Sequence, residues 1–61
     1  MDKDTTAASK KTMLVVDDME MNRDIMSKIF QYDFEILQAE NGLEAMDILY
    51  HKKSDIDVVI L

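Results

Sequence analysis

The sequence predicts an α/β fold in which a three-stranded parallel sheet, in the order 2-1-3, carries one helix on each face. Two uninterrupted apolar runs, at residues 13–16 and 58–61, are typical of strands that are covered on both faces. Helical and then alternating patterns lie between them, which gives the order strand, helix, strand, helix, strand. Because crossovers are right-handed, we expect the first strand at the centre and the alternating second strand at an edge.

The first strand is expected at residues 12–17 and the first helix at residues 19–30. Asp18 stands between them and can cap the helix, since a side-chain oxygen there can accept an unpaired backbone N–H. Two apolar rows predict that one helical face, methionines included, packs in the core. The rows are Met21, Ile25 and Ile29, then Met26 and Phe30.

The second strand, at residues 34–39, alternates between two faces as an edge strand does. Phe34, Ile36 and Gln38 share one face, and Glu35, Leu37 and Ala39 share the other. Asn41 with Glu44 resembles a capping box that opens a second helix, which should end near residues 51–53. Its expected apolar side consists of Leu43, Ala45, Met46 and Leu49. Residues 54–55 supply a turn, and residues 56–61 the third strand.

Composition restricts the class of protein. The chain has 61 residues, no cysteine and a formal charge of −6, so disulfides are excluded and nucleic-acid binding is disfavoured. No apolar run approaches the roughly 20 residues that span a bilayer. Residues 1–11 are polar and without period, which predicts a flexible N-terminal tail. We therefore expect a small, soluble, cytoplasmic protein without a membrane partner.

Three segments, at residues 13–23, 38–49 and 55–61, together resemble the first half of a response-regulator receiver domain. That family is the phospho-accepting module of two-component signalling and has a flavodoxin-like, doubly wound fold. The most specific parts are Asp17-Asp18, Asn22-Arg23 and the segment at residues 39–45. The resemblance implies one domain at residues 12–61, built as the N-terminal half of a receiver.

The resemblance also implies a Mg²⁺ site. Asp18 would be the direct ligand and Asp17 would act mainly through water, in line with the preference of Mg²⁺ for oxygen ligands and retained waters. The residues alone leave open whether Asp18 is a ligand or only a helix cap. With two carboxylates and no third, we expect weak Mg²⁺ binding.

In receivers the phospho-accepting aspartate follows the third strand, a position that would come after Leu61. Asp55 and Asp57 begin that strand, about 15 Å from its other end at 3.3 Å per residue. We therefore expect a truncated receiver that is not phosphorylatable as written and is not an enzyme, with no catalytic residue. A histidine kinase or phosphotransfer protein would be the partner of the parent domain, which would catalyse its own phosphorylation and dephosphorylation.

The third strand is as apolar as a central strand, although no fourth strand follows it in the sequence. An unprotected edge of this kind invites pairing with another chain, so we expect a homo-oligomer, most simply a two-fold dimer. The alternative function is accordingly a non-enzymatic, self-associating half-receiver assembly module, natural or engineered. An isolated metal-binding peptide is a weaker third possibility.

Overall fold

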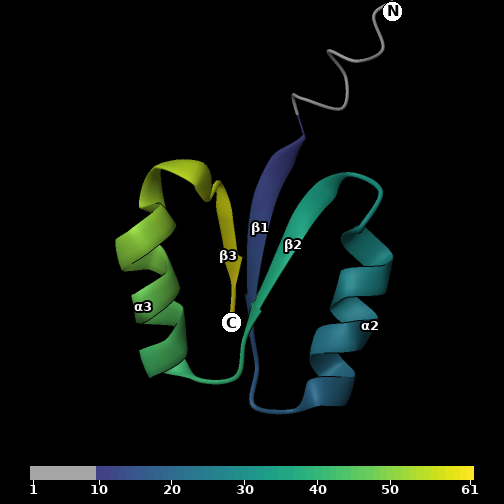
Figure 1. Cartoon of the computed structure of the whole chain (residues 1–61). Coiled ribbons are helices and arrows are strands. Elements are labelled where there is room, and N and C mark those ends of the chain that lie inside the picture. The colour runs from purple at the N-terminus through teal and green to yellow at the C-terminus, as the bar shows by residue number, and fades with distance from the viewer. Residues whose placement is uncertain (1–9) are drawn as a thin grey trace, which may run out of the picture.

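A computed structural model describes residues 10–61 of the chain (Figure 1). The predicted tail at residues 1–11 therefore falls outside the described residues up to residue 9, and Lys11 already belongs to the first strand. The elements are β1 (Lys11–Val16), α2 (Glu20–Phe30), β2 (Phe34–Ala39), α3 (Gly42–Lys52), a short 3₁₀ turn (Lys53–Asp55) and β3 (Val58–Ile60). The predicted order of elements is confirmed.

The strands form one parallel sheet in the order β2-β1-β3. All six residues of β1 pair with β2, from Lys11 opposite Phe34 to Val16 opposite Ala39. On its other side β1 pairs with β3, and Val15 lies opposite Ile60. The central place of β1 explains its uninterrupted apolar run, because both faces and both edges of this strand are covered.

The two helices cover opposite faces of the sheet, as Figure 1 shows. On the α3 face the core consists of Leu14, Val16, Ala39 and Ala45, and Leu14 is fully buried. On the α2 face lies Val15, which is also buried. The predicted fold class is thus confirmed, with a thin apolar layer on each side of β1.

The expected capping of α2 by Asp18 is wrong. The N-cap is Met19, in an extended conformation, and its side chain makes no capping hydrogen bond. β1 ends at Val16 instead of at residue 17, so the chain turns toward the helix over Asp17 and Asp18. Asp17, and not Asp18, stabilises this turn, because its carboxylate accepts the Met19 backbone N–H.

The expected core face of α2 is only partly correct. Met26 and Phe30 are half-buried, and the Phe30 ring meets the Phe34 ring edge-to-face at 6.1 Å. The other row is not part of the core: Met21, Ile25 and Ile29 are all exposed. Both rows have helical spacing, but a helix turns only one stripe toward a sheet, and here that stripe carries Arg23 and Ser27 beside the apolar residues.

The expected apolar side of α3 also needs correction. Ala45 is buried and Leu49 packs against the core, but Leu43 is 85 % exposed and Met46 is 65 % exposed. Ile48 takes their place on the sheet side.

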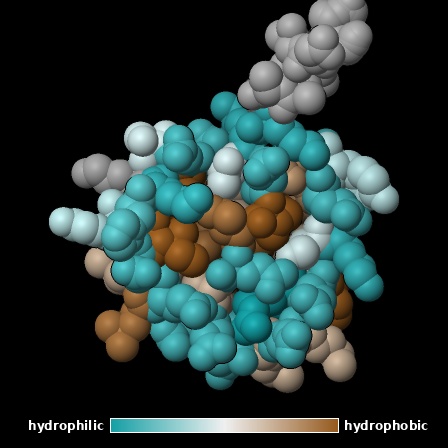
Figure 2. Space-filling view, viewed as in Figure 1, coloured by the Kyte–Doolittle hydropathy of each residue, from teal (hydrophilic) through white to brown (hydrophobic). Residues whose placement is uncertain are grey.

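Figure 2 shows, on the face seen in Figure 1, apolar side chains in the middle and hydrophilic ones around them. Among residues 10–61, no helix is both long and apolar enough to cross a membrane.

Candidate functional site

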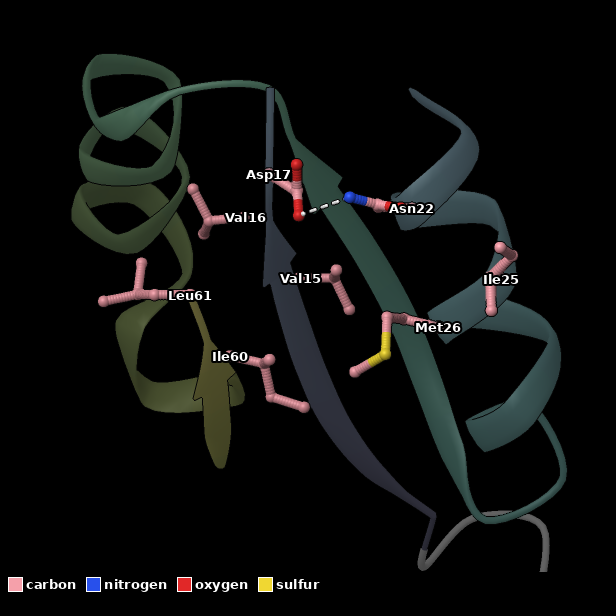
Figure 3. Close-up of a pocket in the computed structure, with 8 residues that line it drawn as sticks. All are labelled: Val15, Val16, Asp17, Asn22, Ile25, Met26, Ile60 and Leu61. Atoms are coloured by element: carbon pink, nitrogen blue, oxygen red, sulfur yellow. Dashed lines mark hydrogen bonds between the residues drawn. The ribbon is translucent and has the colours of Figure 1, made fainter. Parts of the chain in front are cut away.

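The first acidic residue of the predicted pair, Asp17, lies directly beyond the carboxyl end of the central strand. Its backbone N–H donates to the carbonyl oxygen of Ala39 (3.1 Å), which extends the contact between β1 and β2 by one residue. Its Oδ1 accepts the Met19 backbone N–H at 2.9 Å, and its Oδ2 accepts Asn22 Nδ2 at 3.3 Å (Figure 3). The carboxylate is therefore held on both oxygens.

These hydrogen bonds favour the ionised form of Asp17. The bond from the Met19 backbone N–H is the main cause that lowers the pKa of the Asp17 carboxyl below its usual range. Partial desolvation opposes the shift, while the Asn22 side chain and the Arg23 charge add to it. At neutral pH the edge of the sheet thus presents a fixed negative charge.

Arg23 stabilises the same turn through the backbone of Asp17. Its Nη1 donates to the Asp17 carbonyl oxygen at 2.8 Å, and its Nε donates to Gln38 Oε1 at 3.3 Å. Gln38 Nε2 in turn donates to Ser27 Oγ at 2.7 Å. The side chains of α2 and β2 are therefore joined to the end of β1 by one polar network.

The sequence alone did not predict this network. Asn22-Arg23 stood out only through the family resemblance, and Ser27 and Gln38 carried no signal of their own. One hint was available: the alternation of β2 places Gln38 on the same face as the apolar residues Phe34 and Ile36.

Asp18 follows Asp17 in the sequence, and its side chain is exposed. The two carboxylates are adjacent at one edge, as predicted, and they are hard oxygen donors of the kind that Mg²⁺ prefers. Within residues 10–61, however, no group of three or more His, Cys, Asp or Glu side chains could hold a metal ion. The donor set fits an ion that keeps several waters or takes oxygens from a phosphate, and it is too small for a closed site.

A hollow of about 280 Å³ opens beside Asp17, between α2 and β3. Asp17 and Asn22 lie at one end, and the rest of the lining is apolar (Figure 3). The lining residues are Val15, Val16, Asp17, Asn22, Ile25, Met26, Ile60 and Leu61. The acidic end of the sheet therefore adjoins an uncovered apolar surface.

The acidic residues near the third strand lie at the opposite edge of the sheet. Asp57 Oδ2 accepts the Thr12 backbone N–H at 2.9 Å, and the Asp57 N–H donates to the Thr12 carbonyl oxygen at 2.9 Å. Asp55 ends the 3₁₀ turn and lines a surface hollow that also includes Thr12. Because Thr12 lies near the start of β1 and Asp17 follows the end of that strand, neither acid can join the Asp17–Asp18 pair.

An acidic pair at the carboxyl edge of a parallel β2-β1-β3 sheet, with a helix on each face, defines half of a flavodoxin-like α/β domain. Chemotaxis protein CheY of Halobacterium salinarum (strain ATCC 29341 / DSM 671 / R1) is 40 % identical to the chain over 52 residues. The match covers 84 % of this chain and 42 % of the relative, so the chain spans less than half the length of that protein. No family model and no solved structure matches the chain.

The match and the sheet order agree on the same class. Both correspond to the N-terminal half of a response-regulator receiver domain, which confirms the resemblance noted in the sequence.

Proposed function

We propose that the chain acts as the N-terminal half of a receiver module in a cytoplasmic two-component phosphorelay. The observation that supports this most is the Asp17 carboxylate at the carboxyl end of the central strand, which accepts hydrogen bonds from the Met19 N–H and from Asn22 Nδ2. Arg23 Nη1 holds the backbone carbonyl oxygen of the same residue. Ligands of open parallel sheets bind at that edge. The parent domain would receive its phosphoryl group from a histidine kinase or a phosphotransfer protein.

In this proposal Asp18 is the direct ligand of a weakly held Mg²⁺, and Asp17 contributes through water. Both Asp17 oxygens already accept hydrogen bonds, whereas Asp18 is exposed, which supports this division of roles. When bound, the ion would neutralise negative charge on a phosphoryl group. The chain's own contribution is to hold the Asp17 carboxylate ionised and correctly oriented.

A Mg²⁺ titration followed by NMR tests the metal site. We expect the amide signals of Asp17 and Asp18 to move, with a dissociation constant weaker than about 1 mM because two carboxylates are few ligands. Asp18→Ala should abolish the shifts, while Asp55→Asn, at the opposite edge, should leave them unchanged. If the amide signals of Asp17 and Asp18 do not move as Mg²⁺ is added, the proposed site is ruled out.

A polypeptide of these 61 residues alone is proposed not to accept phosphate, because the acceptor position of receivers would come after Leu61. Incubation with a small acyl phosphate and Mg²⁺, followed by intact-mass measurement, should show no phosphoryl adduct. An adduct on Asp17 or Asp18 would contradict the proposal. The coding sequence beyond Leu61 gives a second test: an aspartate directly after the apolar run supports a receiver parent.

A stop codon at that point would favour the second candidate, a non-enzymatic assembly module. Among residues 10–61 the outer edge of β3 has no neighbouring strand, and Val59 on it is 42 % exposed. Two such edges can pair across a two-fold axis. Light scattering after size exclusion should then show a dimer, and Val59→Lys should dissociate this dimer into monomers. A parent chain that is monomeric at micromolar concentration would exclude the assembly module.

A further inference from the structure

We propose that Asn41, at the start of α3, is a site of spontaneous deamidation that converts the helix cap into aspartate or isoaspartate. This inference is independent of the proposed function. The reaction needs an asparagine carboxamide that the next backbone nitrogen can reach, an unhindered residue at that next position, and water. Asn41 and Gly42 are both exposed, so water reaches the peptide bond between them.

The Asn41 carboxamide is polarised by a hydrogen bond. Its Oδ1 accepts the Glu44 backbone N–H at 2.8 Å, which draws electrons from Cγ and makes this carbon more electrophilic. The Glu44 side chain reaches back and accepts the Glu40 backbone N–H at 2.7 Å. The capping box predicted from the sequence is thus present, except that the returning bond goes to residue 40 instead of to Asn41.

The attacking nitrogen belongs to Gly42, the first residue of α3. The first four N–H groups of a helix have no acceptor within the helix, so the Gly42 N–H is not held by the α3 ladder. Nothing lies within 4 Å of the place where a Cβ on Gly42 would stand. Helix ends also open at little cost in free energy, which gives the nitrogen the freedom to approach Cγ.

In the reaction, the Gly42 nitrogen loses its proton and bonds to Asn41 Cγ, the bond from Cγ to Nδ2 breaks, and Nδ2 takes up one proton and leaves as ammonia. The product is a five-membered cyclic imide. Water then opens the ring at either carbonyl carbon, which leaves aspartate or, when the main-chain carbonyl is attacked, isoaspartate. The step is hydrolytic, so it requires no oxidant, metal or enzyme.

The other asparagine of the described chain, Asn22, has the opposite surroundings. It lies within α2, and the next nitrogen, that of Arg23, donates to the Met19 carbonyl oxygen at 3.1 Å. Asn22 Nδ2 is bonded to Asp17, and the Arg23 side chain is fastened to the end of β1. Asn22 is therefore an internal control in the same molecule.

The two products have different effects on the cap. Aspartate keeps the accepting oxygen and places a negative charge at the positive end of α3, which favours the helix. In isoaspartate the peptide bond to Gly42 is made by the side-chain carbon Cγ, so the main chain becomes one atom longer. The hydrogen bond from the Glu44 N–H to the side chain of residue 41 cannot then be kept. The segment after Ala39 would loosen at the same edge of the sheet as Asp17.

The test is incubation of the whole chain in mildly alkaline buffer, followed by trypsin digestion and mass spectrometry. Trypsin cleaves after Arg23 and Lys28 and thus separates the two asparagines. We expect aspartate and isoaspartate to accumulate in the peptide with Asn41, faster at higher pH, while the peptide with Asn22 stays unchanged. Gly42→Ala should slow the reaction several-fold, and the open space beside Gly42 together with its negative φ allows that variant to fold.

An unchanged peptide around Asn41 would overturn the proposal, as would equal rates at Asn41 and Asn22. A Gly42→Ala chain that deamidates as fast as the parent, while its circular dichroism shows the native helix content, would also overturn it. Asn41→Asp supplies the reference for the first product, and it should fold as the parent does.

Discussion

Arg23 Nη1 lies 2.8 Å from the backbone carbonyl oxygen of Asp17, so a charged side chain of α2 fastens the turn that leaves the central strand. The same guanidinium donates to Gln38 on β2. One residue thus couples the position of the acidic edge to the packing of α2 on the sheet.

We predict that Arg23→Ala lowers the free energy of unfolding by about 1.5 kcal/mol, the lower end for a hydrogen bond from a charged group because Arg23 is only half-buried. Arg23→Lys should recover little of this loss, since all the donors of a lysine are on one nitrogen, whereas Arg23 uses two separate nitrogens of its planar guanidinium to bond Asp17 and Gln38. Urea denaturation measures both. Lys28→Ala, on the exposed part of α2, is the control, with a change within about 0.5 kcal/mol; an equal loss there would contradict the role of Arg23.

The Asp17 carboxyl should make stability depend on acid pH. Its pKa is lowered in the folded chain, mainly by the Met19 N–H, so the folded state binds this proton less readily than the unfolded state. The stabilisation is therefore complete above the ordinary aspartate pKa of about 3.9, and it is lost as the pH falls through the lower folded pKa.

Thermal unfolding of the parent chain and of Asp17→Asn over a range of pH tests this dependence. The parent should be the more stable at neutral pH, and the difference should shrink in the acid range. Asp55→Asn should not reproduce the effect, and a difference that is constant with pH would show that ionisation of Asp17 is not the cause.

Two leucines make a matched test of the packing. Leu14 is fully buried, so Leu14→Ala should cost about 2 to 5 kcal/mol. A loss of that size approaches the whole stability of a small domain, and circular dichroism should show a largely unfolded chain. Leu43→Ala should change stability by less than about 0.5 kcal/mol because this side chain is 85 % exposed. Equal losses would mean that Leu43 packs as the sequence pattern suggested.

The cap of α3 gives a further prediction. Asn41→Ala removes the acceptor for the Glu44 N–H and should lower stability by about 1 kcal/mol, while Asn41→Asp should retain it. Amide exchange of Glu44, measured by NMR, should become faster in the alanine variant alone. Unaltered exchange at Glu44 in that variant would show that the hydrogen bond contributes nothing to the cap.

The sequence predicted where the helices and strands lie in the chain better than it predicted which side of each helix faces the sheet. The Phe34–Ala39 strand was predicted to the residue, because alternation sets its faces and Asn41-Gly42 ends it. The position of Asp17 beyond β1 followed from an apolar run that stops at an acid. Periodicity alone could not tell which row of α2 faces the sheet, since both rows have helical spacing. It also missed Arg23 and Gln38, whose partners lie in different elements.

The pairing of β3 with β1 sets the order in which the sheet can assemble. The bond between Thr12 and Asp57, at the start of that pairing, joins residues 45 positions apart, whereas β1 and β2 are joined across α2 alone. Closing the longer loop costs more chain entropy, so β1, α2 and β2 can form first and β3 joins last. The strand that completes the sheet is then also the first to detach when the chain begins to unfold.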